Sequence, residues 1–275
     1  MATIFTFPGK IGDALLEWPI AAAWHKQTGK PYSVWMDKKT CKPLVNLIVS
    51  QPGVEEVKLI DGIENYGCGG QPYHFNMGTE DYGDNTVYHL GMHALPERQI
   101  TLQTALSSKV PLDTDGIKWN PSLTVKAGKA QDRVVIHGQA LCPHTNSVPS
   151  VWRFVNRIRE TLESTFAQIY LVGTKDDLEA GRQVLPDANT FDDEGDMLPT
   201  ADLISNSRMV IGAGSSIAAL AGALGVPCVR VHDNIGTLPK SIWSNLGANQ
   251  LNATEIELRS EFPEWFDKCV VNPEA

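Results

Sequence analysis

Runs of apolar residues alternate with amphipathic stretches along the first half of the chain, which predicts strands and helices in turn. Buried strands are predicted at residues 2–7, 31–37 and 54–61. Helical spacing of apolar positions predicts helices over 14–29, which contains Pro19, and over 41–51. This alternation is typical of a parallel sheet covered by helices.

The pattern fails between residues 65 and 97, where Gly, Tyr, His and Asn dominate. Loops of this length inside a compact domain are usually functional, so we expect this segment to line a cleft. A helix is predicted over 96–108. Residues 113–132 then predict a strand and a connection between domains.

The alternation starts again in the second half. Strands are predicted at residues 133–138, 167–173, 208–214 and 227–233, and helices at 150–164, 176–185, 201–207 and 215–225. We therefore expect an α/β protein with two Rossmann-like domains, 1–125 and 126–275. A last helix over 254–268, with Pro263 inside it, is a candidate to pack back on the first domain.

Composition and charge narrow the class of protein. Hydrophobic residues make up 42% of the 275 residues and charged residues 20%, which is typical of a soluble globular protein. We expect a cytoplasmic protein without a membrane span, since no apolar run is long enough and the N-terminus lacks a signal-peptide pattern. The net charge of −9 argues against broad attachment to nucleic acid or anionic membranes. Five scattered cysteines without a CxxC pair indicate neither a zinc site nor a disulfide framework.

An anion site is one of two interpretations of GAGSSIAALAGALGVP, residues 212–227. A strand leads here into a Gly/Ser turn and a helix whose first N–H groups suit a phosphate. Gly214 would allow close approach of a ligand, and Ser215 and Ser216 could cap the helix or donate to phosphate oxygens. A serine-capped structural turn fits the local sequence equally well.

Two further loops follow predicted strands at the same edge of the second sheet. The first is HGQALCPHTNS (137–147) and the second is GTKDD (173–177). A small molecule held there would meet residues of both loops, and Lys175 would be available as a cation, although a surface role for it is the simpler interpretation. The candidate binding residues are His137, Gly138, Gln139, Gly173, Thr174 and Lys175.

The stretch FPGKIGDALLEWP, residues 7–19, places Asp13 behind a glycine where a strand gives way to a helix. Asp13 could cap that helix, a role worth roughly 1 kcal/mol, or it could serve as a general base in a cleft. Lys10 and Gly12 are further candidates for contact with a phosphate or an acidic acceptor.

These segments resemble the heptosyltransferase-type glycosyltransferases (glycosyltransferase family 9). The likeness rests on IGDALLEWP at 11–19 and on VIGAGSSIAALAGALGVP at 210–227, preceded by FDDEGDMLPTADLISNSRM. The resemblance implies the GT-B fold, in which two Rossmann-like domains face each other across a cleft. It also implies that the first domain binds the acceptor and the second the nucleotide-sugar.

The resemblance further implies an inverting, metal-independent transfer of a sugar from a nucleotide diphosphate to an acceptor hydroxyl, with Asp13 as the general base. No cofactor is implied, and the acceptor would be a saccharide or glycolipid. The chain departs from the family motif at Gly214, Ser216 and Ala219, where the family has Asp, Gly and His. Two alternatives stay open: transfer to a modified base in DNA, and a nucleotide-sugar-binding protein without catalysis.

Overall fold

The computed structural model describes most of the chain. Its described residues are 2–7, 9–61, 81–90, 105–106, 108–125, 128, 131–138, 148–192, 195–213, 215–232, 250–254 and 257–271. Most of the helix predicted over 96–108 and most of the loop at 65–97 lie outside these residues, although residues 105 and 106 are described and helical. Two parallel sheets with packed helices make up the described part, which confirms the predicted α/β class.

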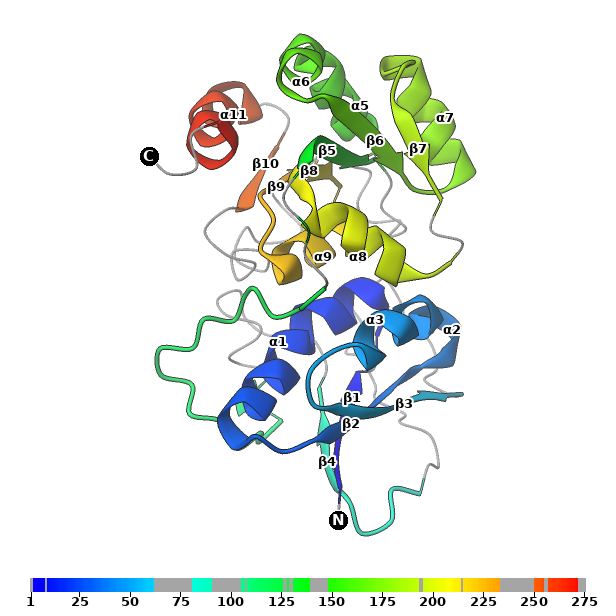
Figure 1. Cartoon of the computed structure of the whole chain (residues 1–275), viewed down its shortest axis with the longest axis vertical. Coiled ribbons are helices and arrows are strands. Elements are labelled where there is room, and N and C mark those ends of the chain that lie inside the picture. Colours follow the sequence, from blue (N-terminus) through cyan, green and yellow to red (C-terminus); the bar gives the residue numbers. More distant parts are fainter. Residues whose placement is uncertain are drawn as a thin grey trace.

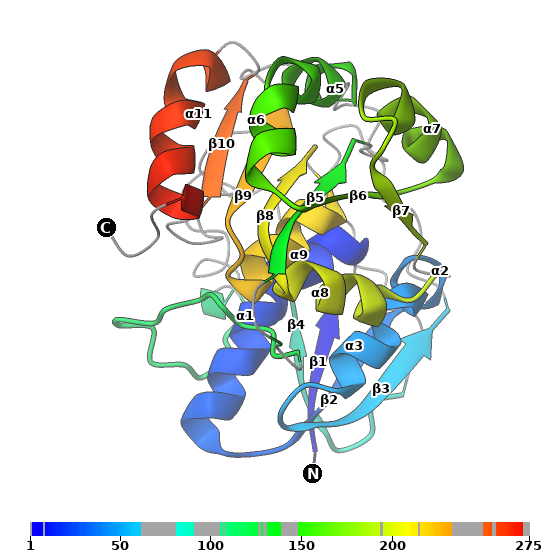
Figure 2. The ribbon, with the colours of Figure 1, turned by 45° about the horizontal axis from the view of Figure 1, so that its top comes forward.

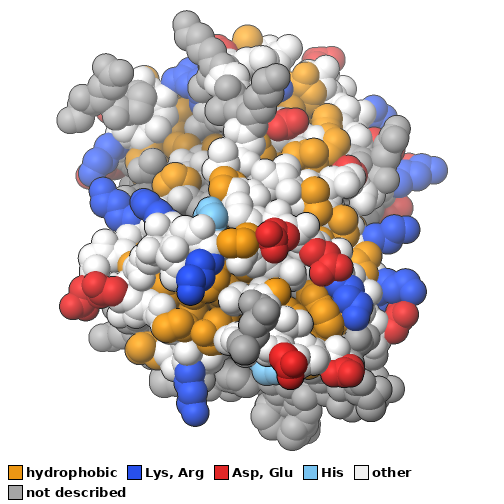
Figure 3. Space-filling view, turned by 60° about the horizontal axis from the view of Figure 1, so that its bottom comes forward, with side chains coloured by type: hydrophobic (Ala, Val, Ile, Leu, Met, Phe, Trp, Pro, Cys, Tyr) orange, Lys and Arg blue, Asp and Glu red, His pale blue; other side chains and the backbone are white. Residues whose placement is uncertain are grey.

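The first sheet has four parallel strands in the order β3-β2-β1-β4. Its strands are β1 (Thr3–Phe7), β2 (Tyr32–Asp37), β3 (Val54–Ile60) and β4 (Thr86–His89). The helices of this half are α1 (Ile11–Thr28), α2 (Lys38–Cys41), the short 3₁₀ helix η1 (Lys42–Leu44) and α3 (Val45–Val49). Seen from the side of this sheet, the described Lys and Arg side chains are interspersed with Asp and Glu (Figure 3).

Helix α1 runs through Pro19 without a break. It ends at Gly29, whose φ of 65° is the left-handed conformation that glycine adopts without a steric penalty. Residues 14 to 21 of this helix are all buried, because the helix is covered on several sides. Trp18 stacks on Phe7 of β1, with ring centroids 5.9 Å apart.

The second sheet has six parallel strands in the order β10-β9-β8-β5-β6-β7. They are β5 (Gln131–His137), β6 (Gln168–Val172), β7 (Asn189–Phe191), β8 (Ser207–Gly212), β9 (Cys228–His232) and β10 (Gln250–Thr254). The helices are α5 (Val148–Arg157), α6 (Arg159–Thr165), α7 (Lys175–Val184), α8 (Met197–Ser205), α9 (Ser216–Leu224) and α11 (Leu258–Phe266). Strands β4, β7 and β10 are additions to the predicted set.

The two halves meet through helices. Figures 1 and 2 show α1 and α3 of the first half against α8 and α9 of the second, between the two sheets. One buried apolar cluster runs through this contact and includes Phe5, Leu16, Ile204 and Leu220. A second cluster lies on the opposite face of the six-stranded sheet. The shared core fixes the start of α1 relative to the second sheet.

The connection between the halves contains no strand in residues 108–125, contrary to the prediction of one within 113–132. Hydrogen bonds to other elements hold this extended segment instead. The Trp18 indole N–H donates to the Ser122 carbonyl at 3.2 Å, and the Gln51 amide bonds both the N–H and the carbonyl of Thr124. The Ser122 N–H donates to Ala223 of α9. Because side chains and a helix end satisfy the backbone here, no strand partner is needed.

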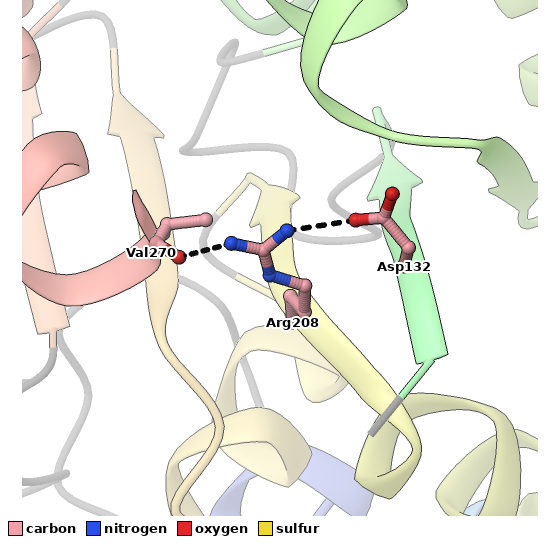
Figure 4. A network of polar contacts seen from close by, with 3 residues as sticks. All are labelled: Asp132, Arg208 and Val270. Carbon is pink, nitrogen blue, oxygen red and sulfur yellow. Dashed lines mark hydrogen bonds and ion pairs between the residues drawn. The ribbon is translucent and has the colours of Figure 1, made fainter. Parts of the chain in front are cut away.

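The last helix packs on the six-stranded sheet, which corrects the expectation that it would return to the first domain. Phe262 of α11 meets Phe154 of α5 edge to face, with centroids 5.2 Å apart. Beyond α11, the carbonyl of Val270 accepts from the Arg208 guanidinium, which also pairs with Asp132 at 2.7 Å (Figure 4). The aromatic residues of α11 pack against apolar residues of the second half of the chain.

Replacing Arg208 by methionine should lower the free energy of unfolding by about 1–2 kcal/mol. The change removes a charge-assisted bond to a carbonyl and an ion pair that join the C-terminal segment to β5 and β8. Urea titrations followed by far-UV circular dichroism would measure the loss. As a control, Lys175→Met removes only an exposed pair with Glu179 at 3.9 Å and should change stability by less than about 0.5 kcal/mol. Equal effects of the two changes would contradict the role of Arg208.

Candidate active site at two helix starts

Asp13 lies in the first turn of α1, three residues after the N-cap residue Lys10. Its Oδ2 accepts a hydrogen bond from the backbone N–H of Lys10 at 3.1 Å. Oδ1 has no hydrogen-bond partner among the described residues. One oxygen therefore serves the helix start from the third helical position, rather than from the N-cap position that the capping interpretation expected, while the other oxygen remains available among the described residues.

The turn before α1 holds Asp13 closely. A β-carbon on Gly9 would lie 2.7 Å from Asp13 Cβ, so only glycine allows this approach. The carbonyl of Gly9 accepts from the Thr40 hydroxyl at 2.8 Å and from the Cys41 thiol at 3.2 Å. The Asp37 carboxylate shares the single hydrogen of this hydroxyl, at 2.6 Å from Thr40 Oγ1. These contacts from α2 hold the turn before α1 in place.

Burial raises the pKa of the Asp13 carboxyl, while the hydrogen bond from the Lys10 N–H and the charge of Lys10 lower it. A carboxylate with a raised pKa is a stronger base than an exposed one. As a whole residue, Asp13 is half-buried by surface area.

The first turn of α9 is not capped by the side chain of its N-cap residue. Ser215 is the N-cap residue, in an extended conformation, and its side chain makes no capping hydrogen bond. Its Oγ is instead 3.0 Å from Nδ1 of His137, at the end of β5. Within the described ranges no side chain bonds the first N–H groups of α9, and the positive end of the helix dipole there favours an anion.

His137, Gly212 and Arg230 form a row across three neighbouring strands. His137 pairs in register with Gly212 of β8, and Gly212 pairs with Arg230 of β9. Burial lowers the pKa of His137 to about 4, so its ring is neutral at neutral pH. Arg230 is 4% exposed, which brings a buried cation to the strand ends beside α9. No local sequence pattern marks Arg230 as a site residue, because only the order of the strands in the sheet places it here.

The two helix starts lie next to each other. A β-carbon placed on Gly12 would lie 3.7 Å from Cα of Ser216 and 3.8 Å from its backbone nitrogen. The turn that carries Asp13 is thus in van der Waals range of the first residue of α9. Two segments about 200 positions apart in the sequence meet at one place.

The loops after β5 and β6 meet around Asp177 of α7. The N–H of Gly138 donates to Asp177 Oδ2 at 3.2 Å. β-Carbons on Gly138 and Gly173 would come within 2.6 Å and 2.2 Å of this carboxylate, which gives both glycines a packing role. Thr174 caps α7 through the N–H of Asp177. Lys175 is exposed and lies near Glu179.

Two of the predicted binding residues, Gln139 and Gly214, lie outside the described part of the chain. The same holds for residues 139–147, which include most of the first predicted loop. Within the described ranges, no three His, Cys, Asp or Glu side chains gather closely enough to hold a metal ion. In those ranges there is also no helix with the length and hydropathy required to cross a membrane.

The neutral state of His137 has a consequence for stability. The unfolded chain binds a proton at His137 below about pH 6.5, whereas the folded chain resists it down to about pH 4. The contribution of His137 to the free energy of unfolding is therefore fully present above about pH 6.5, and it is lost as the pH falls from there toward about pH 4. We expect wild type to lose about 1–2 kcal/mol more than His137→Asn between pH 7 and pH 5. Urea titrations at both pH values would show parallel losses if the histidine were not protected.

Comparisons with solved structures place the fold among known enzymes. E. coli heptosyltransferase WaaC with ADP aligns over 96% of this chain and 100% of its own, with a TM-score of 0.66 and 10% identity. E. coli ADP-heptose LPS heptosyltransferase II aligns over 100% of both chains, with a TM-score of 0.62 and 14% identity. A family 9 glycosyltransferase from Veillonella parvula aligns over 98% of this chain and 90% of its own, with a TM-score of 0.65 and 12% identity.

Neither a protein-family model nor a curated protein sequence matches the chain. The likeness is thus one of fold rather than of sequence along the whole chain. The alignments cover nearly the full length of this chain and of the matched chains, so both sheets are included. The chain therefore has the α/β fold of the heptosyltransferases, as the resemblance of its motifs predicted.

Proposed function

We propose that the protein is an inverting glycosyltransferase that moves a sugar from a nucleotide diphosphate to an acceptor hydroxyl. The observation that carries this proposal is the contact between the Asp13 turn and the start of α9, in a chain with the heptosyltransferase fold. A base and an anion-binding helix start are the two groups that such a transfer needs. Residues 1–125 would bind the acceptor and 126–275 the donor.

Asp13 would act as the general base. Its Oδ2 is occupied by the Lys10 N–H, which leaves Oδ1 to accept the proton of the acceptor hydroxyl. The acceptor oxygen then attacks the anomeric carbon, and the bond from that carbon to the phosphate oxygen breaks. The diphosphate leaves with the bonding electrons on the face opposite the attack, so the configuration inverts.

The start of α9 would stabilise the departing diphosphate. Its open N–H groups and helix dipole favour negative charge, and Arg230 brings a cation to the same edge of the sheet. The proposal needs no metal ion because these groups supply the positive electrostatic potential. Ser215, which is held by His137, would present its hydroxyl to the phosphate oxygens.

An ADP-sugar is the first donor to test, because the similar structures include WaaC with ADP and an ADP-heptose heptosyltransferase. A saccharide or glycolipid is the proposed acceptor. The test is incubation with ADP-heptose and with UDP-, GDP- and CDP-sugars, with nucleotide diphosphate release and product mass as readouts. Release of diphosphate that depends on donor and on Asp13 supports the proposal.

Tight donor binding without any release of diphosphate would instead identify a nucleotide-sugar-binding protein. Transfer to DNA is the less favoured alternative. The net charge is −9, and acidic side chains are mixed with basic ones on the described surface that Figure 3 shows. A gel-shift assay at low salt would detect DNA binding, because phosphate contacts weaken strongly as salt rises.

A further inference from the structure

Glu17 is a buried carboxyl group directly behind Asp13. It is 1% exposed, and neither of its oxygens has a hydrogen-bond partner among the residues that the structure describes. It follows Asp13 by four residues on α1, which places the two side chains on one face of the helix. Helical side chains lean toward the N-terminus of the helix, so the Glu17 carboxyl leans toward Asp13.

An ionised carboxylate in this position would be costly. A buried charge without a counter-ion or hydrogen-bond donor usually takes up a proton instead. Burial raises the pKa of Glu17 well above its usual range, and the charge of Asp13 raises it further. Asp13, in contrast, has the Lys10 N–H and the Lys10 charge to stabilise its ionised form. The pKa of Asp13 is therefore lower than the pKa of Glu17, and Asp13 ionises first as the pH rises.

The other charged groups around α1 do not alter this ranking. Helix α1 packs on β1, α2 and α9, and neither β1 nor α9 contains a titratable side chain. On α2, Lys38 and Lys39 are exposed. The Cys41 thiol, whose pKa burial raises to about 12, stays neutral, and the Asp37 carboxylate accepts from Thr40.

We propose that Asp13 and Glu17 act as a coupled pair that keeps one proton at neutral pH, with Glu17 as the protonated member. This inference rests on the proposed function for its catalytic meaning. Neutral Glu17 leaves Asp13 as the only negative charge of the pair, next to the helix start that would hold the donor diphosphate. Glu17 is a positioning residue, since it acts through Asp13 and is too buried to touch a substrate. Ionisation of Glu17 would add a second charge and repel the donor.

The protonation state can be measured without any activity. Carbon-13 NMR of protein labelled at the glutamate carboxyl groups should show one resonance, absent in Glu17→Gln, that is still protonated at pH 7. In Asp13→Asn, the titration of this resonance should move to lower pH by about one unit or more, because the neighbouring charge is removed. A Glu17 resonance that is ionised at pH 7 would overturn the inference even if the protein transfers sugar.

The pH profile tests the catalytic meaning. In wild type, kcat/KM for the donor should fall at alkaline pH as Glu17 ionises, and this limb should be lost, or shifted by more than about one pH unit, in Glu17→Gln. Glu17→Leu should lose the same alkaline limb, and it serves as the test if the Glu17→Gln variant folds poorly. The exposed Glu56→Gln should keep the wild-type profile. An alkaline limb that persists unchanged in both Glu17 variants would contradict the role of Glu17 in transfer. If Glu17 is protonated but the protein transfers no sugar, only the proposed function is contradicted.

Discussion

Replacing Asp13 by asparagine will lower kcat for sugar transfer by about 10²–10⁴-fold, the usual contribution of a general base. Asparagine has the same shape, and its amide oxygen can still accept the Lys10 N–H, so the start of α1 should form as before. It cannot take a proton from the acceptor. Donor binding does not need that proton transfer, and the change removes a negative charge near the diphosphate, so affinity for ADP in calorimetric titrations should not be weaker than in wild type.

Asp61→Asn is a matched control for this change, because Asp61 is exposed and, in the part of the chain that the structure describes, pairs only with Lys38. It should retain wild-type turnover. In wild type, the acid limb of kcat/KM should lie at higher pH than for an exposed aspartate, since burial raises the pKa of Asp13. Turnover of the asparagine variant at the wild-type rate would remove Asp13 from the mechanism.

A negative charge at the first residue of α9 is expected to weaken donor binding without lowering the stability of the fold. Ser216→Asp should weaken ADP binding about 10- to 100-fold, because its carboxylate would compete for the N–H groups and repel the diphosphate. The same charge favours the helix start by about 0.3–1 kcal/mol, so the variant should not be less stable than wild type. Calorimetry for ADP and urea titration would measure the two effects.

Two control variants isolate the position of that charge. Ser216→Ala should bind ADP within a few-fold of wild type, because the proposed contacts come mainly from backbone N–H groups. Ser260→Asp puts the same charge into the first turn of α11, which packs on the other face of the six-stranded sheet. It should leave ADP affinity unchanged. Equal weakening by Ser216→Asp and Ser260→Asp would show that the effect is not local to α9.

The sequence predicted the longer strands and helices well because their apolar periodicity is strong. It missed β4 (TVYH), β7 (NTF) and β10 (QLNAT), which are short and partly polar. Such segments become strands through pairing with a neighbour, and that pairing is not visible in local pattern. The strand expected in the connection failed for the complementary reason, since Gln51, Trp18 and α9 satisfy its backbone.

The candidate site was predicted in part. The sequence singles out Asp13 and the start of α9 because turn residues and a family-like motif mark them, and parallel topology brings strand ends to one edge. The contact between Gly12 and Ser216, and the row from His137 to Arg230, depend on how elements pack and on strand order. Glu17 reads as an ordinary polar position of a helix until its complete burial is known.

The central claim is that the Asp13 turn and the start of α9 form one site for a nucleotide-diphosphate sugar. A crystal structure of the protein with an unreactive ADP-sugar tests it most directly. The account predicts that the diphosphate oxygens accept hydrogen bonds from the first backbone N–H groups of α9, with the anomeric carbon of the sugar facing Asp13. A diphosphate bound elsewhere, or a sugar turned away from Asp13, would contradict the account.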